Sequence, residues 1–335
     1  MIRYILRRIL LLVPVLVGLS VLVFCIARLL PGDPVRLAAG PNATAADIAS
    51  VAKEFGLDRP FVVQYWDYAT GLLRGDWGVS IFTRRPVAED LAVYLPATLE
   101  LVLAAMILAV GLGIPAGLLA AVYRNRWPDF LSRTVSLGAI SMPRFFLGLV
   151  FQLAFAMWLG WLPLSGRFPL TEDPPPTITG FLTLDALASG NLHAFGVALQ
   201  YLALPAIAMS LSPLATIMRM MRASTIEVLG QDYVTTERAL GLPGRQILFK
   251  YVLKNAVSAT LTVIGLYFGW LLGGTVLVET VFDWPGIGLY ATQAVLSQDF
   301  MPIIGVTLCI GALFITVNLI VDLLYGLLNP RVRLG

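Results

Sequence analysis

The sequence predicts an all-α integral membrane protein with six transmembrane helices. Of its 335 residues, 58% are hydrophobic and 13% are charged, whereas a soluble domain carries about 25% charged residues. The apolar residues occur in blocks of about 20, the length at which a helix crosses a hydrocarbon layer of about 30 Å. The chain is therefore too apolar for water, and one membrane domain explains its length better than two soluble domains.

Six segments meet this length requirement. They comprise residues 9–29, 96–122, 134–159, 197–218, 256–279 and 302–328. The first follows three arginines, as in a signal peptide, but lacks a small-residue cleavage site, so we expect a retained helix. Prolines within the spans, among them Pro143 and Pro213, remove a backbone hydrogen bond and favour kinks. We interpret the spacing of Gly113 and Gly117 as close helix packing.

The segments between the spans divide the chain further. Residues 1–30 form the first transmembrane helix, residues 31–95 an extracytoplasmic region, and residues 96–335 a five-helix membrane core. Helical spacing over 44–55 and 61–73 predicts a small helical cap within the extracytoplasmic region. The core carries an outer insert, 161–196, in which three consecutive prolines favour extended backbone, and a long charged loop, 219–254.

Basic residues concentrate on one side of the predicted spans, which orients the chain with both termini in the cytoplasm. That side carries Arg3, Arg7, Arg8, Arg124, Arg126, Arg133, Arg219, Arg222, Arg238, Arg245, Lys250, Lys254, Arg331 and Arg333. The acids on the same side are Asp129, Glu227, Asp232 and Glu237. Because the basic residues flank apolar spans rather than line one polar face, they indicate membrane orientation and not nucleic-acid binding.

The sequence contains no pattern for a nucleotide, metal or catalytic site. No Gly-Lys pair occurs, so there is no phosphate-binding loop, and no paired Cys or His spacing predicts a metal site or a cofactor. His193 is the one histidine, and we interpret it as a solvated loop residue. Intramembrane proteolysis needs a serine with a base or two aspartates within spans, and only Asp322 lies clearly in one. An enzyme is therefore disfavoured.

The charged loop 219–254 is the most informative segment. Tyr233, Glu237 and Leu240 can share one helical face, with Gly241 ending that helix and Pro243 following it. The resulting short helix could receive a partner protein. It could equally rest on lipid headgroups through its arginines, and the residues alone do not separate the two.

The chain resembles the inner-membrane permeases of peptide-type ABC importers over nearly its whole length, and it is most similar to the B subunits of dipeptide permeases. The motifs that carry the resemblance are Leu-Pro-Gly-Asp-Pro at 30–34, Gly-Leu-Asp at 56–58, Gly-Asp-Trp-Gly at 75–78, Pro-Ala-Thr-Leu-Glu at 96–100, Ser-Met-Pro at 141–143, Glu-Val-Leu-Gly-Gln-Asp-Tyr-Val at 227–234, Glu-Thr-Val-Phe-Asp-Trp-Pro-Gly-Ile-Gly at 279–288 and Val-Asp-Leu-Leu-Tyr-Gly at 321–326.

The resemblance implies a type I importer permease in the bacterial inner membrane that forms half of a pore for dipeptides or short peptides. Its implied partners are a second homologous permease, two cytoplasmic ATPase subunits that bind the ATP, and an extracytoplasmic peptide-binding protein. Oligopeptides, glutathione or nickel are alternative cargoes of similar permeases. A proton-coupled secondary transporter is the alternative from another class, and it could use Glu279 or Asp322.

The resemblance also implies that the charged loop docks an ATPase subunit. The family's Glu-Ala-Ala triplet falls on Thr235, Thr236 and Glu237 and is not matched, whereas its glycine is matched by Gly241. The docking residues implied are Tyr233, Thr235, Thr236, Glu237, Arg238, Ala239, Leu240 and Gly241. Because the first glutamate of the triplet is missing, we expect shape and apolar packing to contribute more to docking.

Four ionisable residues lie within or near the predicted spans, where a charge costs at least about 2.5 kcal/mol. They are Glu100, Arg144, Glu279 and Asp322. For Glu100, Arg144 and Glu279, two interpretations stay open: ion pairing or a headgroup contact, and lining a path for a zwitterionic peptide. We expect Asp322 to anchor the cytoplasmic end of its helix through Arg331 or Arg333.

Overall fold

The computed structural model describes residues 2–29, 43–54 and 59–328 of the chain. Within these ranges the fold is helical, and β structure is limited to an isolated bridge between Val79 and Pro86. The predicted motifs at 30–34 and 56–58, together with Arg331 and Arg333, lie outside the described residues. The described part therefore agrees with the predicted all-α class.

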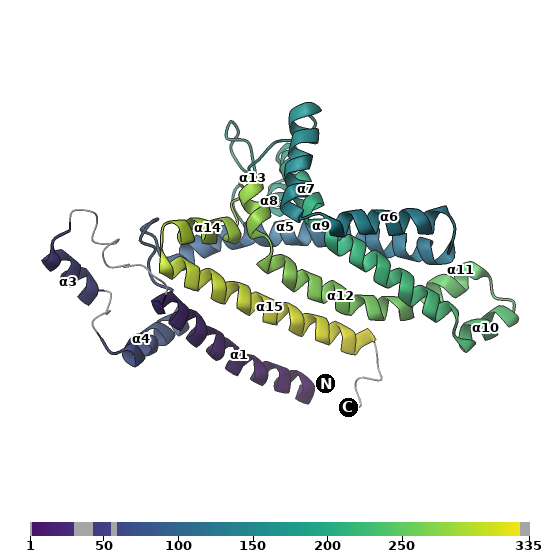
Figure 1. Ribbon diagram of the computed structural model, residues 1–335, viewed down its shortest axis with the longest axis horizontal. Helices are drawn as coiled ribbons and strands as arrows, with labels where there is room; N and C mark the ends of the chain where they lie inside the picture. The colour runs from purple at the N-terminus through teal and green to yellow at the C-terminus, as the bar shows by residue number, and fades with distance from the viewer. Residues whose placement is uncertain (1, 30–42, 55–58, 329–335) are drawn as a thin grey trace. The chain divides into compact units, whose positions relative to one another are not determined.

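The helices follow the chain in the order shown in Figure 1. They are α1 (Ile2–Leu29), α3 (Ala45–Glu54), α4 (Phe61–Leu73), α5 (Val87–Val122), α6 (Trp127–Ser141), α7 (Arg144–Phe151), η1 (Gln152–Trp158), α8 (Leu182–Ala188), α9 (Leu192–Leu229), α10 (Asp232–Ala239), α11 (Gly244–Gln246), η2 (Ile247–Val252), α12 (Leu253–Gly273), α13 (Val276–Phe282), α14 (Ile287–Leu296) and α15 (Phe300–Leu328). Both helices predicted for the cap are present, as α3 and α4, and η1 and η2 are π-helical.

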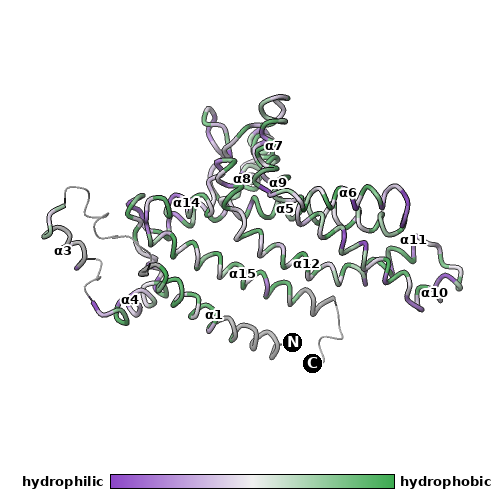
Figure 2. The backbone as a smooth tube through the Cα atoms, in the orientation of Figure 1, coloured by the Kyte–Doolittle hydropathy of each residue, from purple (hydrophilic) through white to green (hydrophobic). Residues whose placement is uncertain are grey.

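Among the described residues, four helical stretches are long and apolar enough to cross a membrane: α5, α9, residues 244–273 and the Phe300–Val321 part of α15. Figure 2 shows their predominantly hydrophobic colouring. Helices α6 and α7 pass the same test as a bent pair, which gives up to five spans. The described apolar stretch of α1, Val13–Ile26, is shorter than a span. The predicted count of six spans remains a prediction.

The predicted third span, 134–159, is not one straight helix. Helices α6 and α7 meet at an angle of 101°, and Met142 between them is extended, with φ −108° and ψ 134°. Pro143 explains the break, because its ring disfavours helical backbone at the preceding residue and it has no N–H to donate. The bend places Arg144 at the first position of α7.

The predicted fifth span, 256–279, also extends past a break. Helix α12 ends at Gly273, and α13 begins at Val276. The N–H of Gly274 donates to the carbonyls of Trp270 and Leu271, both at 3.0 Å, which closes the last turn of α12. Two consecutive glycines have low helix propensity, so the helix ends there although the apolar sequence continues.

The outer insert is more ordered than the prolines indicated. Residues 159–181 form no regular helix, but Gln152 in η1 donates hydrogen bonds to the carbonyls of Leu164 and Val281 at 2.9 and 3.0 Å. In α8, burial opposes ionisation of Asp185, yet hydrogen bonds from Thr179 and Gly180 hold the pKa of its carboxyl below the ordinary value. The Asp185 carboxylate is therefore ionised at neutral pH and holds the backbone at Thr179 and Gly180 against α8.

The contacts divide the chain into two compact units, and each is described by itself. In the unit of residues 99–284 and 316–335, α9 lies beside α6 and α12 and also packs on α7 and α8 (Figure 1). In the unit of residues 2–98 and 285–315, Phe24 of α1 packs against Phe61, Tyr65 and Tyr68 of α4, with ring centroids 5.1–5.5 Å apart. The second unit also buries Val87, Leu91, Ile287, Tyr290 and Val306 in one apolar cluster.

Helices α5 and α9 approach closely at Gly117, as the glycine spacing predicted. A Cβ there would lie 2.5 Å from the carbonyl oxygen of Met218 and 2.8 Å from the Cβ of Met221. We expect Gly117→Ala to cost about 1–3 kcal/mol through overpacking and to lower the melting temperature of the purified protein. Gly111→Ala is the control, because a Cβ at Gly111 meets no atom within 4 Å. Equal melting temperatures for the two variants would contradict the close approach.

Candidate functional site

The loop between α9 and α12 folds as a short helix, α10, just beyond the end of α9. Gly230 and Gln231 separate α9 from α10. Val234, on the inner side of α10, is fully buried against Ile247 and Val252. This apolar contact gives α10 a defined position at the junction of two long helices.

Helix α10 ends in the glycine cap that the sequence predicted. Gly241 has φ of +77°, a left-handed conformation that costs other residues about 1 kcal/mol. Its N–H donates to the carbonyl of Arg238 at 3.0 Å, and the N–H of Leu242 donates to that of Glu237 at 3.3 Å. These two bonds form a Schellman motif. A Cβ at Gly241 would meet no atom within 4 Å, so this position faces open space.

The outer side of α10 is exposed. Leu240 is 73% exposed and Tyr233 is 39% exposed, whereas Glu237 is half-buried. The hydroxyl of Tyr233 accepts a hydrogen bond from Nδ2 of Asn255 in α12 at 2.9 Å. Phe249 of η2, which sequence analysis did not select, is 55% exposed. The remaining predicted docking residues are also exposed: Thr235, Thr236, Arg238, Ala239 and Gly241.

Near the same end of this unit, Asp129 of α6 joins α6 to α9. Its carboxylate is 1% exposed and accepts paired hydrogen bonds from Arg222 of α9 at 2.6 and 2.9 Å. Arg133 donates at 3.1 and 2.6 Å, and the backbone N–H of Asn125 donates at 2.9 Å. This network, here called the Asp129 clamp, satisfies a buried charge in the way that buried carboxylates require.

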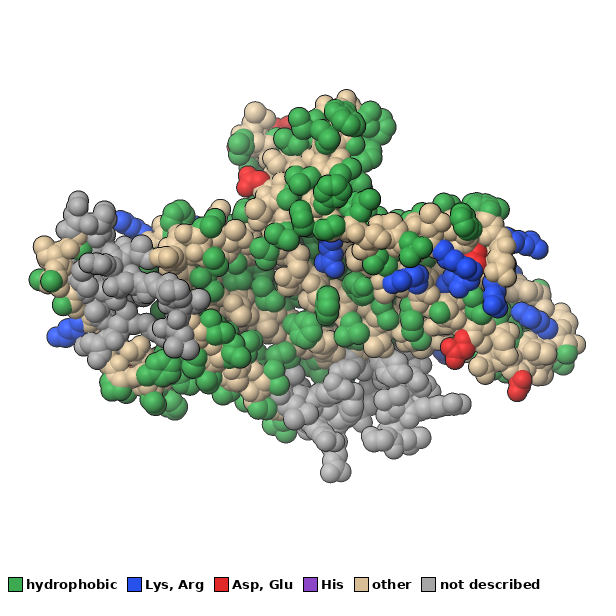
Figure 3. Space-filling model, in the orientation of Figure 1, with side chains coloured by type: hydrophobic (Ala, Val, Ile, Leu, Met, Phe, Trp, Pro, Cys, Tyr) green, Lys and Arg blue, Asp and Glu red, His purple; other side chains and the backbone are tan. Residues whose placement is uncertain are grey.

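Basic side chains gather near the Asp129 clamp and α10. Figure 3 shows Lys and Arg side chains over α6, α10 and α11. The exposed arginines in these segments, in the loop before α6 and in the adjacent part of α9 are Arg124, Arg126, Arg133, Arg219, Arg238 and Arg245. This end is the one that the charge distribution predicts to be cytoplasmic.

Glu100 of α5 is paired rather than free. It is 4% exposed and accepts hydrogen bonds from Arg167 at 3.1 and 2.5 Å. The N–H and hydroxyl of Thr183 in α8 donate to its other oxygen at 2.8 and 2.6 Å. The Arg167 guanidinium lies 5.7 Å from the ring centroid of Trp284. Of the two open interpretations, this geometry favours pairing for Glu100.

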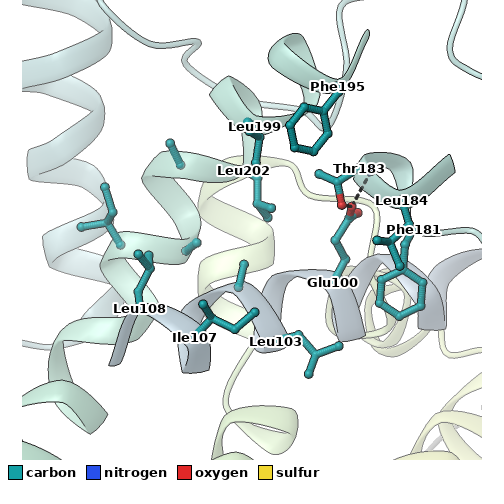
Figure 4. A pocket seen from close by; sticks show the side chains of 14 residues that line it. Glu100, Leu103, Ile107, Leu108, Phe181, Thr183, Leu184, Phe195, Leu199 and Leu202 are labelled. Carbon is teal, nitrogen blue, oxygen red and sulfur yellow. Dashed lines mark hydrogen bonds between the residues drawn. The ribbon is translucent and has the colours of Figure 1, made fainter. Parts of the chain in front are cut away.

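The cavity beside Glu100 is apolar. It has a volume of about 500 Å³ and lies between α5, α8 and α9. Figure 4 shows Leu103, Ile107 and Leu202 around it, with the Glu100 carboxylate bonded to Thr183 at its edge. Because Glu100 and Thr183 are the polar side chains in its lining and are already bonded to each other, the cavity suits hydrocarbon rather than a zwitterionic peptide.

Arg144 has a different environment. It begins α7 directly after the bend and lines a cavity of about 310 Å³ with Ser212, Gly274 and Val278. Among the described residues, no carboxylate forms an ion pair with it, in contrast to Arg133, Arg167 and Arg222. Arg144 is therefore the candidate whose charge is left available.

The other two candidates lie on α13 and α15. Glu279 lies in α13, where it is fully buried, and its backbone carbonyl accepts a hydrogen bond from the N–H of Trp284 at 2.8 Å. The backbone of Asp322 belongs to α15, but its side chain lies outside the described part of the structure. Glu100 and Arg144 thus line different cavities, and the expected anchor for Asp322 stays a prediction.

Comparisons with known proteins assign the family. Residues 113–334 match the family described as "Binding-protein-dependent transport system inner membrane component", and residues 1–102 match its companion N-terminal family. Among solved structures, the inward-facing MetNI methionine ABC transporter matches with a TM-score of 0.52 at 16% identity, over 70% of this chain and 93% of that chain. At this identity the likeness concerns the fold alone.

Curated relatives are similar over nearly the whole chain. The probable D,D-dipeptide transport system permease protein DdpB of Escherichia coli (strain K12) is 44% identical over 97% of this chain and 95% of the relative. The dipeptide transport system permease protein DppB of Alkalihalophilus pseudofirmus is 41% identical over 99% and 100%. The glutathione transport system permease protein GsiC of Escherichia coli (strain K12) is 39% identical over 99% of each. The resemblance found from the motifs is confirmed, and the chain belongs to the family of inner membrane components of binding-protein-dependent transport systems.

Proposed function

We propose that this chain is a permease subunit of an ATP-driven importer that carries dipeptides or other short peptides across the bacterial inner membrane. It forms half of the pore, and a second homologous permease forms the other half. Two cytoplasmic ATPase subunits supply the driving force, and an extracytoplasmic binding protein delivers the peptide. Family membership supports the need for a binding protein, and the two dipeptide permeases at 44% and 41% identity support the cargo.

The observation that carries the mechanism is the exposed outer side of α10 at the junction of α9 and η2. Leu240 at the end of α10 presents an apolar side chain, Gly241 next to it leaves open space, and Phe249 of η2 is exposed as well. A groove on an ATPase subunit receives this surface by shape and apolar packing, without the glutamate of the usual triplet. Because Val234 fixes α10 to η2, movement of the ATPase subunit passes to the helices as a rigid-body tilt.

The orientation of the chain follows from its charges. The arginines around α10 and the Asp129 clamp lie on the cytoplasmic side, so both termini lie there too. The cap formed by α3 and α4 lies outside and receives the binding protein.

A cysteine introduced at the exposed Leu73 is expected to react with a membrane-impermeant thiol reagent added outside intact cells.

Glutathione is the second candidate cargo, because the glutathione permease GsiC is 39% identical over 99% of this chain. Glutathione is itself a short peptide with free carboxylates. Binding proteins select the cargo in systems of this kind. Displacement of labelled dipeptide from the binding protein by glutathione would therefore favour glutathione as a cargo, and retention of the dipeptide would favour dipeptides.

Reconstitution tests the proposed function. The purified complex of this chain with its partners is placed in proteoliposomes, with labelled dipeptide and binding protein on the outer side. We expect uptake only when ATP is present on the ATPase side and the binding protein is present outside. Uptake by this chain alone, driven by a proton gradient, would overturn the proposal in favour of a secondary transporter.

A further inference from the structure

We propose that Arg144 holds the terminal carboxylate of the peptide during its passage through the membrane. The inference rests on the proposed function and adds the residue and the chemical group that it recognises. It rests on four features of Arg144: its depth, its available charge, the space beside it and its place at a helix N-terminus.

Arg144 lies within the length of the spans, far from the end that carries the Asp129 clamp. It follows α6, whose 15 residues extend about 22 Å from the end that carries the Asp129 clamp. Ser212, which lines the same cavity, lies near the midpoint of the 38-residue α9. A hydrocarbon layer is about 30 Å thick, so with the Asp129 clamp at the cytoplasmic surface, as proposed above, both residues lie away from the cytoplasmic headgroups. An arginine at this depth is costly and normally marks a function or an obligatory partner.

Within the described residues, Arg144 has no acidic partner. Arg133 and Arg222 bind Asp129, and Arg167 binds Glu100. Arg133 pairs within α6, Arg222 joins α9 to α6, and Arg167 ties the outer insert to α5. The guanidinium of Arg144, by contrast, is close to the small cavity and to Gly274. The partner that its charge requires is therefore supplied by something that enters the cavity.

The backbone around Arg144 favours an anion. Pro143 is the N-cap of α7, so the first N–H groups of α7 lack acceptors within their own helix and carry the positive end of its dipole. Gly274 allows the guanidinium to approach the backbone closely, since a Cβ there would lie 3.0 Å from Nη1 of Arg144. The cavity of about 310 Å³ has the volume of about ten water molecules, which is enough for a hydrated carboxylate.

The planar fork of an arginine matches a carboxylate with two parallel hydrogen bonds. A phosphate matches it as well, so a lipid headgroup is the other possible source of the anion. A peptide brings its carboxylate to this depth each time it is transported, whereas a headgroup belongs at the membrane surface. Amidation of the peptide separates the two sources, because it removes the carboxylate and leaves the lipid unchanged.

The test compares a labelled dipeptide with its C-terminal amide in proteoliposomes that hold the whole transport complex. Uptake of each is divided by the fraction of binding protein that it occupies, which is measured separately. For the unmodified complex we expect uptake of the free acid to exceed that of the amide about tenfold. Equal normalised uptake of the two probes would overturn the inference, and this measurement needs no variant.

Variants locate the effect at Arg144. Arg144→Gln is expected to lower uptake of the free acid about tenfold and to leave uptake of the amide unchanged, which removes the preference. Arg144→Lys keeps the charge but loses the fork, so an intermediate preference is expected. Arg219→Gln, which removes an exposed arginine of α9 that does not line this cavity, is the control and should keep the preference. An equal loss for both probes in Arg144→Gln would indicate a structural or lipid contact and overturn the inference.

The same experiment separates this inference from the proposed function. If the unmodified complex shows no ATP-dependent and binding-protein-dependent uptake of any peptide, the proposed function fails. If it transports dipeptide but Arg144→Gln keeps the preference for the free acid, only the assignment of Arg144 fails.

Discussion

Replacing Leu240 by Asp is expected to reduce ATP-driven uptake at least tenfold while leaving the chain folded. Leu240 follows α10 and is 73% exposed, so the substitution removes little packing within the chain itself. In the docked complex the same side chain would bury an unpaired carboxylate against an apolar groove. A tenfold loss corresponds to about 1.4 kcal/mol, which is below the usual cost of burying such a charge. Uptake into proteoliposomes and co-purification of the ATPase subunits measure the effect.

Leu240→Met is the matched control for this prediction. Methionine keeps the volume and the apolar character of the side chain, so uptake should stay within about twofold of the unmodified protein. The melting temperature of each variant, measured without the ATPase subunits, checks that the chain itself is intact. Normal uptake by Leu240→Asp would exclude α10 as the docking surface.

Replacing Asp129 by Asn is expected to destabilise the protein by about 3 kcal/mol. The change leaves Arg133 and Arg222 beside each other without the buried carboxylate that joins them. Removing one partner of a buried charged network typically costs about 3–5 kcal/mol, and the exposure of Arg133 places the expectation at the low end. The melting temperature of the purified protein should fall by about 5 °C or more at a fixed heating rate.

A double variant tests the cause of this loss. Asp129→Asn combined with Arg222→Gln removes both the carboxylate and the more buried arginine, so part of the lost stability should return. Asp173→Asn, in an exposed part of the outer insert, is the control and should melt as the unmodified protein does. The single variant Arg222→Gln completes the comparison. If the double variant melts below Asp129→Asn by as much as Arg222→Gln alone melts below the unmodified protein, the two residues are not coupled.

The sequence was sufficient for features that depend on local physics. Blocks of apolar residues identified the long helices α5, α9, α12 and α15, because length and hydropathy are the dominant constraints in a membrane. The glycine cap at Gly241 was predictable because a left-handed residue followed by proline ends a helix in a recognisable way. Gly117 was predictable as a close contact because glycines four residues apart in an apolar span let two helices approach.

Features that depend on distant residues were not predictable. Nothing near Glu100 in the sequence points to Arg167, which is 67 positions away, and the pairing of Asp129 with Arg222 spans 93 positions. Hydropathy also extended the third and fifth spans across the breaks at Pro143 and Gly274, because the side chains there stay apolar. These long-range contacts are also what distinguishes the paired Arg167 and Arg222 from Arg144, which has no such partner among the described residues.

The continuity of α9 has a mechanical consequence. Its 38 residues form one continuous helix with a contour length of about 57 Å, with Pro205 and Pro213 inside it and α10 directly after its end. A tilt of about 10° about the midpoint of a straight rod of that length moves each end by about 5 Å in opposite directions. Ser212 lies close to that midpoint, and so does the cavity that it shares with Arg144. If α9 tilts in this way during transport, its middle beside Arg144 moves least, and the segments at its two ends move most.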